Sequence, residues 1–257
     1  MEVPVPRYSR HILLKVIGED GQRNIEKSRV LVAGLGALGS TAAMLLARAG
    51  VKFLRIADVD SPELHNLHRQ ILYDERDTVR EISKAQAAAE RLRAANSHVE
   101  VEAVHAAIVA ENIERLIDDV DLVVDALDNA RTRYIVNDAI LARGIPYVFG
   151  GAIETCGNVM TIIPGETPCL RCIWPDPEAV LQHPTAATVG ILSSAASAVA
   201  SMEVTEALKI LAGKQHEILQ GLLVMDVWRG TFCVAHVEAN PDCICRKDRS
   251  KAGQDIR

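Results

Sequence analysis

R-V-L-V-A-G-L-G-A-L-G-S, residues 29–40, joins a short apolar run to a glycine loop of the form G-x-G-x-x-G. The run predicts a buried strand, and residues 38–49 predict the next helix, closed by Gly50. Glycines at such a turn let backbone N–H groups approach a phosphate at a helix N-terminus. The stretch therefore predicts a nucleotide site, the alternative being that the glycines only pack helix against strand. The loop residues of this site are Gly34, Gly36, Ala37 and Gly39.

Strand and helix patterns alternate through the first 146 residues. Apolar runs predict further strands over 51–57, 99–104 and 120–126, and helical patterns cover 82–95, 110–117 and 130–143. This alternation is typical of βαβ units. It predicts an α/β fold with a Rossmann-like, doubly wound, mostly parallel sheet.

The pattern changes after Pro146. Residues 147–154 and 158–163 predict a hairpin-like pair with Cys156 and Gly157 between them, and a Pro- and Cys-rich loop follows over 164–184. A long helix is predicted over 191–211, and a β-rich segment over 222–238 with a turn near Arg229 and Gly230. The parallel sheet is therefore expected to carry a C-terminal antiparallel extension.

Composition narrows the class of protein. The chain has 257 residues and 49% hydrophobic content, enough for one large α/β domain. A net charge of −6 argues against a general nucleic-acid binder. The first eight residues lack the pattern of a signal peptide, and 186–204 is too polar for a membrane span. With six cysteines and no secretion signal, we expect a cytoplasmic protein whose cysteines bind metal rather than form disulfides.

Polar residues with an affinity for nucleotides follow the second strand. Asp58 stands where an acidic residue would accept the ribose hydroxyls. Asn66, Arg69 and Gln70 lie in the next loop, at the carboxyl edge of the sheet, and Lys84 begins a helix close by. Arginine forks onto phosphate oxygens and lysine reaches the same anions. Each could be a surface charge alone, but the set predicts a phosphate site.

Asp128, followed by Asn129, is expected at the end of the fourth strand, across the crevice from the glycine loop. A carboxylate there suits Mg²⁺ held between phosphates. The alternative role of Asp128 is to cap the helix that begins at Ala130, and one residue could do both.

Four cysteines form two close pairs, Cys169-x-x-Cys172 and Cys243-x-Cys245. Two pairs about seventy residues apart are the usual layout of a closed four-thiolate zinc site. The alternative is four reduced free thiols. A zinc site would staple the C-terminal segment to the loop after the sheet.

The ordered series resembles the MoeB/ThiF/HesA family, the bacterial and archaeal relatives of ubiquitin-activating enzymes. Its motifs are R-Y-S-R-H-I-L-L, G-L-G-A-L-G-S, D-V-D, N-L-H-R-Q, a helix lysine, D-A-L-D-N, P-C-L-R-C and N-P-D-C-I-C, from Arg7 to Cys245. The pattern is most similar to the molybdopterin-synthase and sulfur-carrier adenylyltransferases. The resemblance implies a homodimer that uses ATP with Mg²⁺ to adenylate the C-terminal glycine carboxylate of a ubiquitin-like sulfur carrier ending in Gly-Gly.

The resemblance also implies roles for single residues. Asp58 would bind ribose, and Arg10 would reach across the dimer into the partner's active site. The triphosphate would be surrounded by Asn66, Arg69, Lys84 and Asp128, and zinc would be held by Cys169, Cys172, Cys243 and Cys245. The residues expected to act in catalysis are Arg10, Arg69, Lys84 and Asp128.

The resemblance predicts one domain over residues 1–245. It comprises an N-terminal helical arm (1–28), a nucleotide-binding half (29–165) and a zinc- and carrier-binding half (166–245), with a disordered tail over 246–257. Three departures from the family pattern stand out. The second cysteine pair is C-x-C, tighter than the common C-x-x-C. Ala37 replaces a frequent glycine, and the crossing loop around 182–185 has no cysteine. We therefore expect the reaction to stop at the acyl-adenylate.

Three other functions stay open at this point. The same chemistry could act on a small-molecule carboxylate. A nicotinamide-dependent oxidoreductase would also explain the glycine loop and Asp58, but it needs neither Arg69 nor Lys84. A zinc-stapled scaffold without catalysis would leave the phosphate-site residues without a role.

Overall fold

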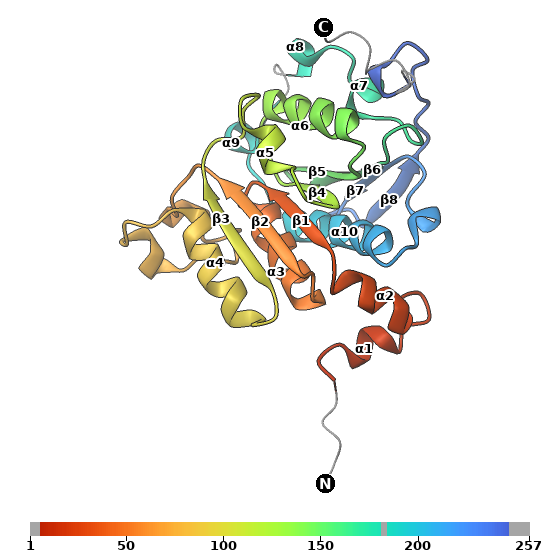
Figure 1. Ribbon diagram of the computed structural model, residues 1–257. Coiled ribbons are helices and arrows are strands. Elements are labelled where there is room, and N and C mark those ends of the chain that lie inside the picture. The colour runs from red at the N-terminus through yellow and green to blue at the C-terminus, as the bar shows by residue number, and fades with distance from the viewer. Residues whose placement is uncertain (1–5, 181–183, 247–257) are drawn as a thin grey trace, which may run out of the picture.

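The computed structural model describes residues 6–180 and 184–246, and its strands form one eight-stranded sheet (Figure 1). The strands are β1 (Arg29–Ala33), β2 (Phe53–Asp58), β3 (Glu100–His105), β4 (Leu122–Asp125), β5 (Tyr147–Ile153), β6 (Cys156–Ile162), β7 (Leu222–Asp226) and β8 (Thr231–Ala235). Their order is β3-β2-β1-β4-β5-β6-β7-β8, parallel from β3 to β5 and antiparallel from β5 to β8. This confirms the predicted doubly wound sheet and its antiparallel extension.

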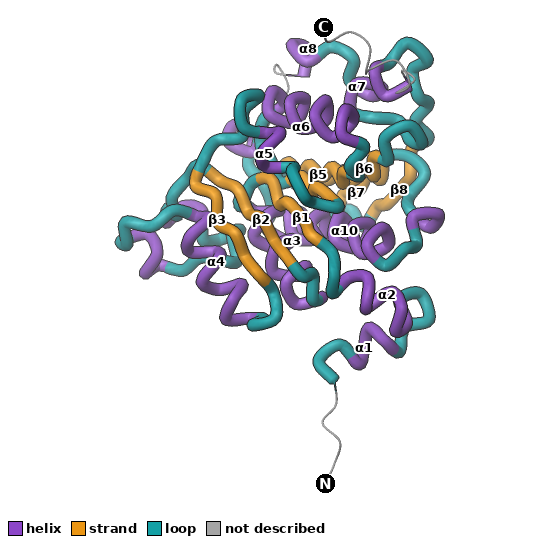
Figure 2. The backbone as a smooth tube through the Cα atoms, viewed as in Figure 1, coloured by secondary structure: helices purple, strands orange, loops and turns teal. Residues whose placement is uncertain are grey.

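The helices cover both faces of the sheet (Figure 2). They are α1 (Ser9–Ile12), α2 (Gly18–Ile25), α3 (Ala37–Ala49), α4 (Lys84–Ala95), α5 (Ile113–Leu116), α6 (Ala130–Arg143), α7 (Leu170–Ile173), α8 (Pro177–Val180), α9 (Ala186–Val189) and α10 (Ser193–Leu211). One core lies between the sheet and α3, α4 and α10, and the second lies between the sheet and α5 and α6. The predicted sequence halves thus share one sheet.

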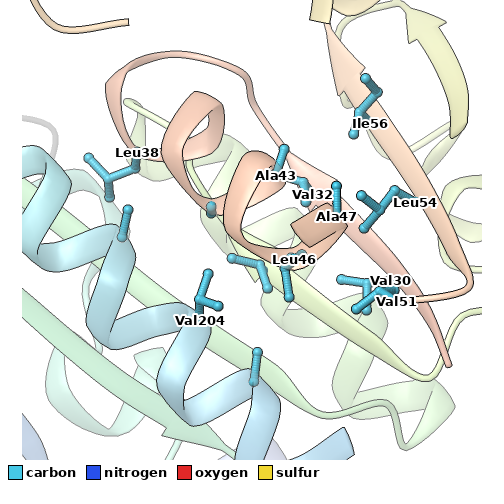
Figure 3. Packing of buried hydrophobic residues seen from close by; sticks show 14 of the residues in the cluster. Val30, Val32, Leu38, Ala43, Leu46, Ala47, Val51, Leu54, Ile56 and Val204 are labelled. Carbon is cyan, nitrogen blue, oxygen red and sulfur yellow. The ribbon is translucent and has the colours of Figure 1, made fainter. Parts of the chain in front are cut away.

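Strand β1 shows why the central run is apolar throughout. Val30 and Val32 face α3, while Leu31 and Ala33 face the opposite core. Side chains alternate along a strand, so a strand covered on both faces has no polar side. Figure 3 shows Leu46 of α3 among Val30 and other members of the first core.

Several predicted elements start later than expected, and two of them show the reason. The second strand begins at Phe53 rather than 51, because the N–H of Val51 bonds back to Leu46 O and closes α3 after Gly50. Helix α5 begins at Ile113 rather than 110, because the Asn112 side chain binds the backbone of residues 107 and 109 in a local turn. Such side-chain bonds compete with the helix for backbone groups.

The hairpin turn also differs from the prediction. It lies at Glu154 and Thr155, and Cys156 and Gly157 belong to β6. Glu154 has a φ of 51°, in the left-handed region that tight turns require. Its backbone also pairs with Ile191, so the predicted long helix starts only at Ser193.

The N-terminal arm packs at the far end of α3. Tyr8 lies against Gly50, where an added Cβ would come within 2.5 Å of the ring, and its hydroxyl accepts a hydrogen bond from Asn96 Nδ2 at 2.8 Å. Residues 1–5 and 247–257 lie outside the described range, including most of the tail expected to be disordered. Arg246, assigned to that tail, instead ends the 3₁₀ turn η4 (Ile244–Arg246).

Among the described helices, none combines the length and apolar character needed to cross a membrane. The cytoplasmic location expected from the sequence stays a prediction.

Helix α10 carries two fully buried glutamates with different surroundings. Glu206 accepts hydrogen bonds from Thr161 Oγ1 (2.9 Å), the backbone N–H of Leu219 (2.7 Å) and Lys209 Nζ (2.5 Å). Glu203 lies against Gly150, where an added Cβ would come within 2.2 Å of its carboxyl group. Neither carboxyl oxygen of Glu203 has a hydrogen-bond partner among the described residues. Burial, with the nearby charge of Asp125, raises the pKa of Glu203 well above its usual value.

The raised pKa of Glu203 predicts a pH-dependent stability. The folded state keeps the proton, whereas the unfolded chain releases it above about pH 4.3. This contribution is therefore complete below that pH and is lost as pH rises through the folded pKa, by at most about 1.4 kcal/mol per pH unit. Urea unfolding of wild type and Glu203→Gln between pH 5 and 8 should give a difference in unfolding free energy that shifts in favour of the variant as pH rises.

Glu206→Gln is the matched control, because it weakens three hydrogen bonds of an equally buried glutamate. It should destabilise the protein by about 1–3 kcal/mol at neutral pH. A constant free-energy difference between wild type and Glu203→Gln across this range would contradict a buried neutral acid.

Candidate functional site

The glycine loop joins β1 to α3 at the point where the strand order reverses between β1 and β4. Gly34 has a φ of 96°, and an added Cβ there would lie 2.5 Å from Ala126 O. A Cβ on Gly39 would lie 2.0 Å from Gly34 O. These two glycines therefore let strand, helix and the loop after β4 meet without intervening side chains.

Gly36, unlike Gly34 and Gly39, has room where a Cβ would lie. The nearest atom to an added Cβ is Gln70 Nε2 at 3.8 Å, so the backbone here is not closed off by packing. Gly36 immediately precedes α3, whose first turn starts at Ala37 and has no capping side chain. The N–H groups of a first helical turn lack partners within the helix and favour an anion. The arrangement fits the predicted phosphate loop, with Ala37 as its first helical residue.

Asp58, the last residue of β2, is bound to this loop. Its Oδ2 accepts the N–H of Leu35 at 2.6 Å, and its Oδ1 accepts the N–H of Asp60 at 2.8 Å. Burial raises the pKa of Asp58, while the Asp60 N–H and the charge of Lys84 oppose this shift. Each carboxylate oxygen keeps a further lone pair for a ligand hydroxyl.

The loop after β2 packs under the glycine loop. Asn66 and Gln70 are buried, and Asn66 Oδ1 accepts hydrogen bonds from Gln70 Nε2 and Arg69 Nη2, both at 3.1 Å. Tyr73 connects the two loops through a 2.9 Å hydrogen bond from its hydroxyl to Leu35 O. Gln70 Oε1 is buried without a hydrogen-bond partner among the described residues. Three predicted site residues are thus held together beside the phosphate loop.

Lys84 is the first residue of α4 and is 4% exposed. Ser83 and Gln86 form a capping box that fixes the start of this helix. The Lys84 ammonium donates to Asp60 Oδ2 at 2.8 Å, and the Lys84 N–H bonds to Asp60 O at 2.8 Å. Asp60 is not among the predicted site residues, although the D-V-D spacing places it two residues after Asp58. Asp60 is the counter-ion of Lys84.

Asp128 lies three residues beyond the end of β4, not at its end as expected. The alternative role considered for it, capping α6, is wrong. The cap is Asn129, whose Oδ1 accepts the N–H of Thr132 at 2.9 Å. Asp128 is exposed, and its carboxylate receives a 3.4 Å contact from Asn129 Nδ2. Its oxygens therefore stay available for a cation, whereas the side-chain oxygen of Asn129 is used by the helix.

Arg10 is exposed on α1 and is not brought to this site within one chain. Tyr8 and Gly50 place the N-terminal arm at the end of α3 opposite the glycine loop. A helix of 13 residues is about 20 Å long. Any action of Arg10 on a nucleotide would therefore come from a second copy of the chain.

The four cysteines of the two pairs converge. The sulfur atoms of Cys169, Cys172, Cys243 and Cys245 lie within 4.8 Å of one another. The Cys169–Cys243 and Cys172–Cys245 separations are 3.5 Å, too long for a disulfide of about 2.05 Å. Tetrahedral zinc with bonds of about 2.3 Å requires sulfur separations of about 3.8 Å.

The surroundings of these cysteines also fit a cation. Burial raises the pKa of the Cys169 thiol to about 12, so a positive charge is needed to stabilise its thiolate. The first pair is attached to α6, because Asn137 Oδ1 accepts the N–H of Leu170 at 3.1 Å and Arg171 pairs with Asp138 at 2.6 Å. The cluster thus ties residues 243–245 to α6. In the crossing loop, Gln182 and His183 lie outside the described residues.

Comparison with known proteins gives a consistent result. A sequence model of the ThiF family matches residues 8–246. The sulfur carrier protein ThiS adenylyltransferase of Bacillus subtilis (strain 168) is 44% identical over 224 residues, covering 87% of this chain and 65% of that protein. The SAMP-activating enzyme E1 of Haloferax volcanii is 36% identical over 251 residues, covering 97% of this chain and 92% of that protein.

Among solved structures, E. coli MccB with ATP has a TM-score of 0.82 to this chain and 19% identity. The match covers 95% of this chain and 75% of that one. At this identity the likeness concerns the fold alone.

Proposed function

The chain belongs to the ThiF family, and from this premise we propose that it is an ATP-dependent adenylyltransferase acting on a ubiquitin-like sulfur carrier. The C-terminal glycine carboxylate of the carrier attacks the α-phosphate of ATP, forming an acyl-adenylate and releasing pyrophosphate. The carrier is proposed from the name of the Bacillus subtilis relative, of which this chain spans about two thirds.

One structural observation carries the reaction type. A glycine loop at a helix start, the carboxylate of Asp58 and the buried Lys84 lie at one edge of the sheet. The reaction joins two anions, so it depends on alignment and on cancelling charge more than on a general base. In this proposal Asp58 binds the ribose, and Arg69 and Lys84 bind the phosphates.

Magnesium fits the carboxylate of Asp128, which is exposed and not used by the cap of α6. Bound there with the phosphates, Mg²⁺ would neutralise charge on the leaving pyrophosphate. Asn66 and Gln70 form the floor of the site, and Asn66 also orients Arg69 through their 3.1 Å hydrogen bond. These residues bind and orient the substrate.

The alternatives make different demands on the site. A nicotinamide-dependent oxidoreductase does not require a buried cation such as Lys84 beside the phosphate loop. A small-molecule carboxylate would need the same groups as the carrier, so only the identity of the acyl substrate separates the two.

ATP–pyrophosphate exchange tests the reaction. With Mg²⁺ and a carrier ending in Gly-Gly, the wild-type protein should catalyse exchange that depends on the free C-terminal carboxylate. Lys84→Ala and Arg69→Ala should each lower the rate by about 10²–10³-fold, because each removes a charge that stabilises the transition state.

Lys52→Ala is the matched control, since Lys52 pairs with Glu100 at the opposite edge of the sheet. Its rate should equal that of wild type. Exchange with a small carboxylic acid but with no carrier would favour the alternative substrate. Thermal stabilisation by NAD and not by ATP would refute the adenylyltransferase.

A homodimer is part of the proposal. Arg10 lies about one helix length from the glycine loop of its own chain and can serve only the site of a second copy. In a symmetric dimer the same contact occurs twice.

Mixing two inactive variants tests whether Arg10 of one copy acts in the site of the other. Arg10→Ala and Lys84→Ala should each be inactive alone. After subunit exchange at equal concentrations, about a quarter of wild-type activity should return, because half the dimers are mixed and each holds one intact site. Mixed dimers that form without recovering activity would disprove action across the dimer.

We further propose that the four-cysteine cluster holds a structural zinc ion. Metal analysis should find one zinc per chain. Cys169→Ser should lose the metal and lower the melting temperature by at least about 5 °C, because the binding energy of structural zinc contributes to folding.

Cys233→Ser is the control, because Cys233 is exposed on β8 and outside the cluster. It should keep the zinc and the wild-type melting temperature. An unchanged melting temperature after complete zinc removal would refute the structural role.

A further inference from the structure

Asp125, the last residue of β4, is fully buried and receives three hydrogen bonds. Its Oδ1 accepts the N–H of Leu127 at 2.8 Å. Its Oδ2 accepts Arg133 Nε at 3.0 Å and the hydroxyl of Tyr147 at 2.6 Å. Sequence analysis assigned no role to this carboxylate, which opens the D-A-L-D-N stretch.

Arg133 completes the arrangement from the first turns of α6. Its Nη2 donates to Leu127 O at 2.6 Å and to Gly150 O at 2.8 Å, and its guanidinium lies 4.9 Å from the centre of the Phe149 ring. The N–H of Leu127 is therefore held by Asp125, and its carbonyl by Arg133. We refer to Asp125 and Arg133 as the Leu127 clamp.

The clamp leaves Asp128 as a single residue between two fixed neighbours. Leu127 is bound on both its backbone groups, and Asn129 is bound as the cap of α6. The Asp128 carboxylate itself is exposed and lightly bonded. The backbone on both sides of Asp128 is thus held by hydrogen bonds, while the Asp128 carboxylate stays exposed.

Stability alone is a poor explanation for the clamp. A buried ion pair costs about as much in desolvation as it returns, and apolar residues of similar volume often stabilise as well or better. Burial raises the pKa of Asp125, and Arg133 opposes this shift, as expected for a charge held in an unfavourable place. The pair does fix the orientation of the N–H and the carbonyl of Leu127.

We propose that Arg133 is a positioning residue, which through Leu127 holds Asp128 in the geometry that binds a divalent cation on the nucleotide phosphates. This inference rests on the proposed function, because it assumes that Asp128 meets the metal–nucleotide complex. Residues that orient metal ligands typically contribute 10–100-fold to metal affinity.

The geometry requires arginine rather than any cation. Three acceptors from two segments surround one planar group: Asp125 and Leu127 at the end of β4, and Gly150 in β5. A guanidinium reaches them with fixed N–H directions, whereas an ammonium is a single point charge. Arg133→Lys therefore keeps a positive charge beside Asp125 and loses the hold on the Leu127 carbonyl.

The test is a titration of Mn²⁺ into the full-length protein saturated with a non-hydrolysable ATP analogue, followed by the electron paramagnetic resonance of free Mn²⁺. Arg133→Lys should weaken Mn²⁺ binding to this complex by about tenfold. Affinity for the analogue in the absence of metal should stay within twofold of wild type. Tyr147→Phe, which removes one hydrogen bond to Asp125, should show a smaller weakening in the same direction, and it carries the test if Arg133→Lys does not fold.

Arg131→Lys is the matched control, because Arg131 lies two residues earlier on α6 with 74% of its side chain exposed. It should bind Mn²⁺ as wild type does. Equal Mn²⁺ affinity in wild type, Arg133→Lys and Tyr147→Phe would overturn the proposal. So would an equal loss of analogue affinity without metal, since that would mean general damage to the site.

The same titration distinguishes a failure of the positioning role of Arg133 from a failure of the proposed adenylyltransferase function. If Asp128→Asn binds Mn²⁺ as tightly as wild type, Asp128 does not hold the metal and the positioning role falls with it. If exchange with the carrier is found while Mn²⁺ affinity is unaffected by Arg133→Lys, the adenylyltransferase stands and only the positioning role is refuted.

Discussion

The structure depends on the contact of three backbone segments at the glycine loop. Gly39 on α3 lies against the carbonyl of Gly34, and Gly34 lies against the carbonyl of Ala126 after β4. Because no side chain fits between them, the helix start, the strand end and the neighbouring loop occupy one small volume. This contact directs the first turn of α3 toward the edge of the sheet where Asp58 ends β2, Lys84 begins α4 and Asp128 follows β4. Without it, the charged groups would belong to separate loops.

Each cation of the site is paired with a carboxylate or hydrogen-bonded to neutral groups of the chain. Lys84 is neutralised by Asp60, Arg69 is bonded to Asn66 and the carbonyl of His65, and Arg133 is paired with Asp125. Buried cations without such partners would be costly. These cations therefore have partners within the chain, whereas the exposed Asp128 carboxylate and the buried Gln70 Oε1 keep acceptor capacity.

Much of the fold followed from local signals. The glycine loop, the apolar runs and the helix stop at Gly50 predicted the sheet class and most elements, because each depends on neighbouring residues in the chain. The errors came from competing local bonds: Asn112 replaced the start of a helix by a turn, and Asn129 took the cap expected of Asp128. The partners of the site were harder to foresee. Asp60, Asp125 and Arg133 act through contacts between segments, and no spacing rule identifies those contacts in one sequence. The convergence of the cysteines was predicted from their spacing, and the structure brings all four together.

The pairing of Lys84 with Asp60 has a consequence for anion selection. The lysine is 4% exposed and already holds a carboxylate at 2.8 Å, so an arriving phosphate competes with a built-in anion. A singly charged ion such as acetate would only exchange one carboxylate for another and gain little. In the proposed function, a polyphosphate would bring several negative oxygens to Lys84 together with the glycine-loop contacts. The Asp60 carboxylate therefore favours a highly charged anion over a singly charged one at this lysine.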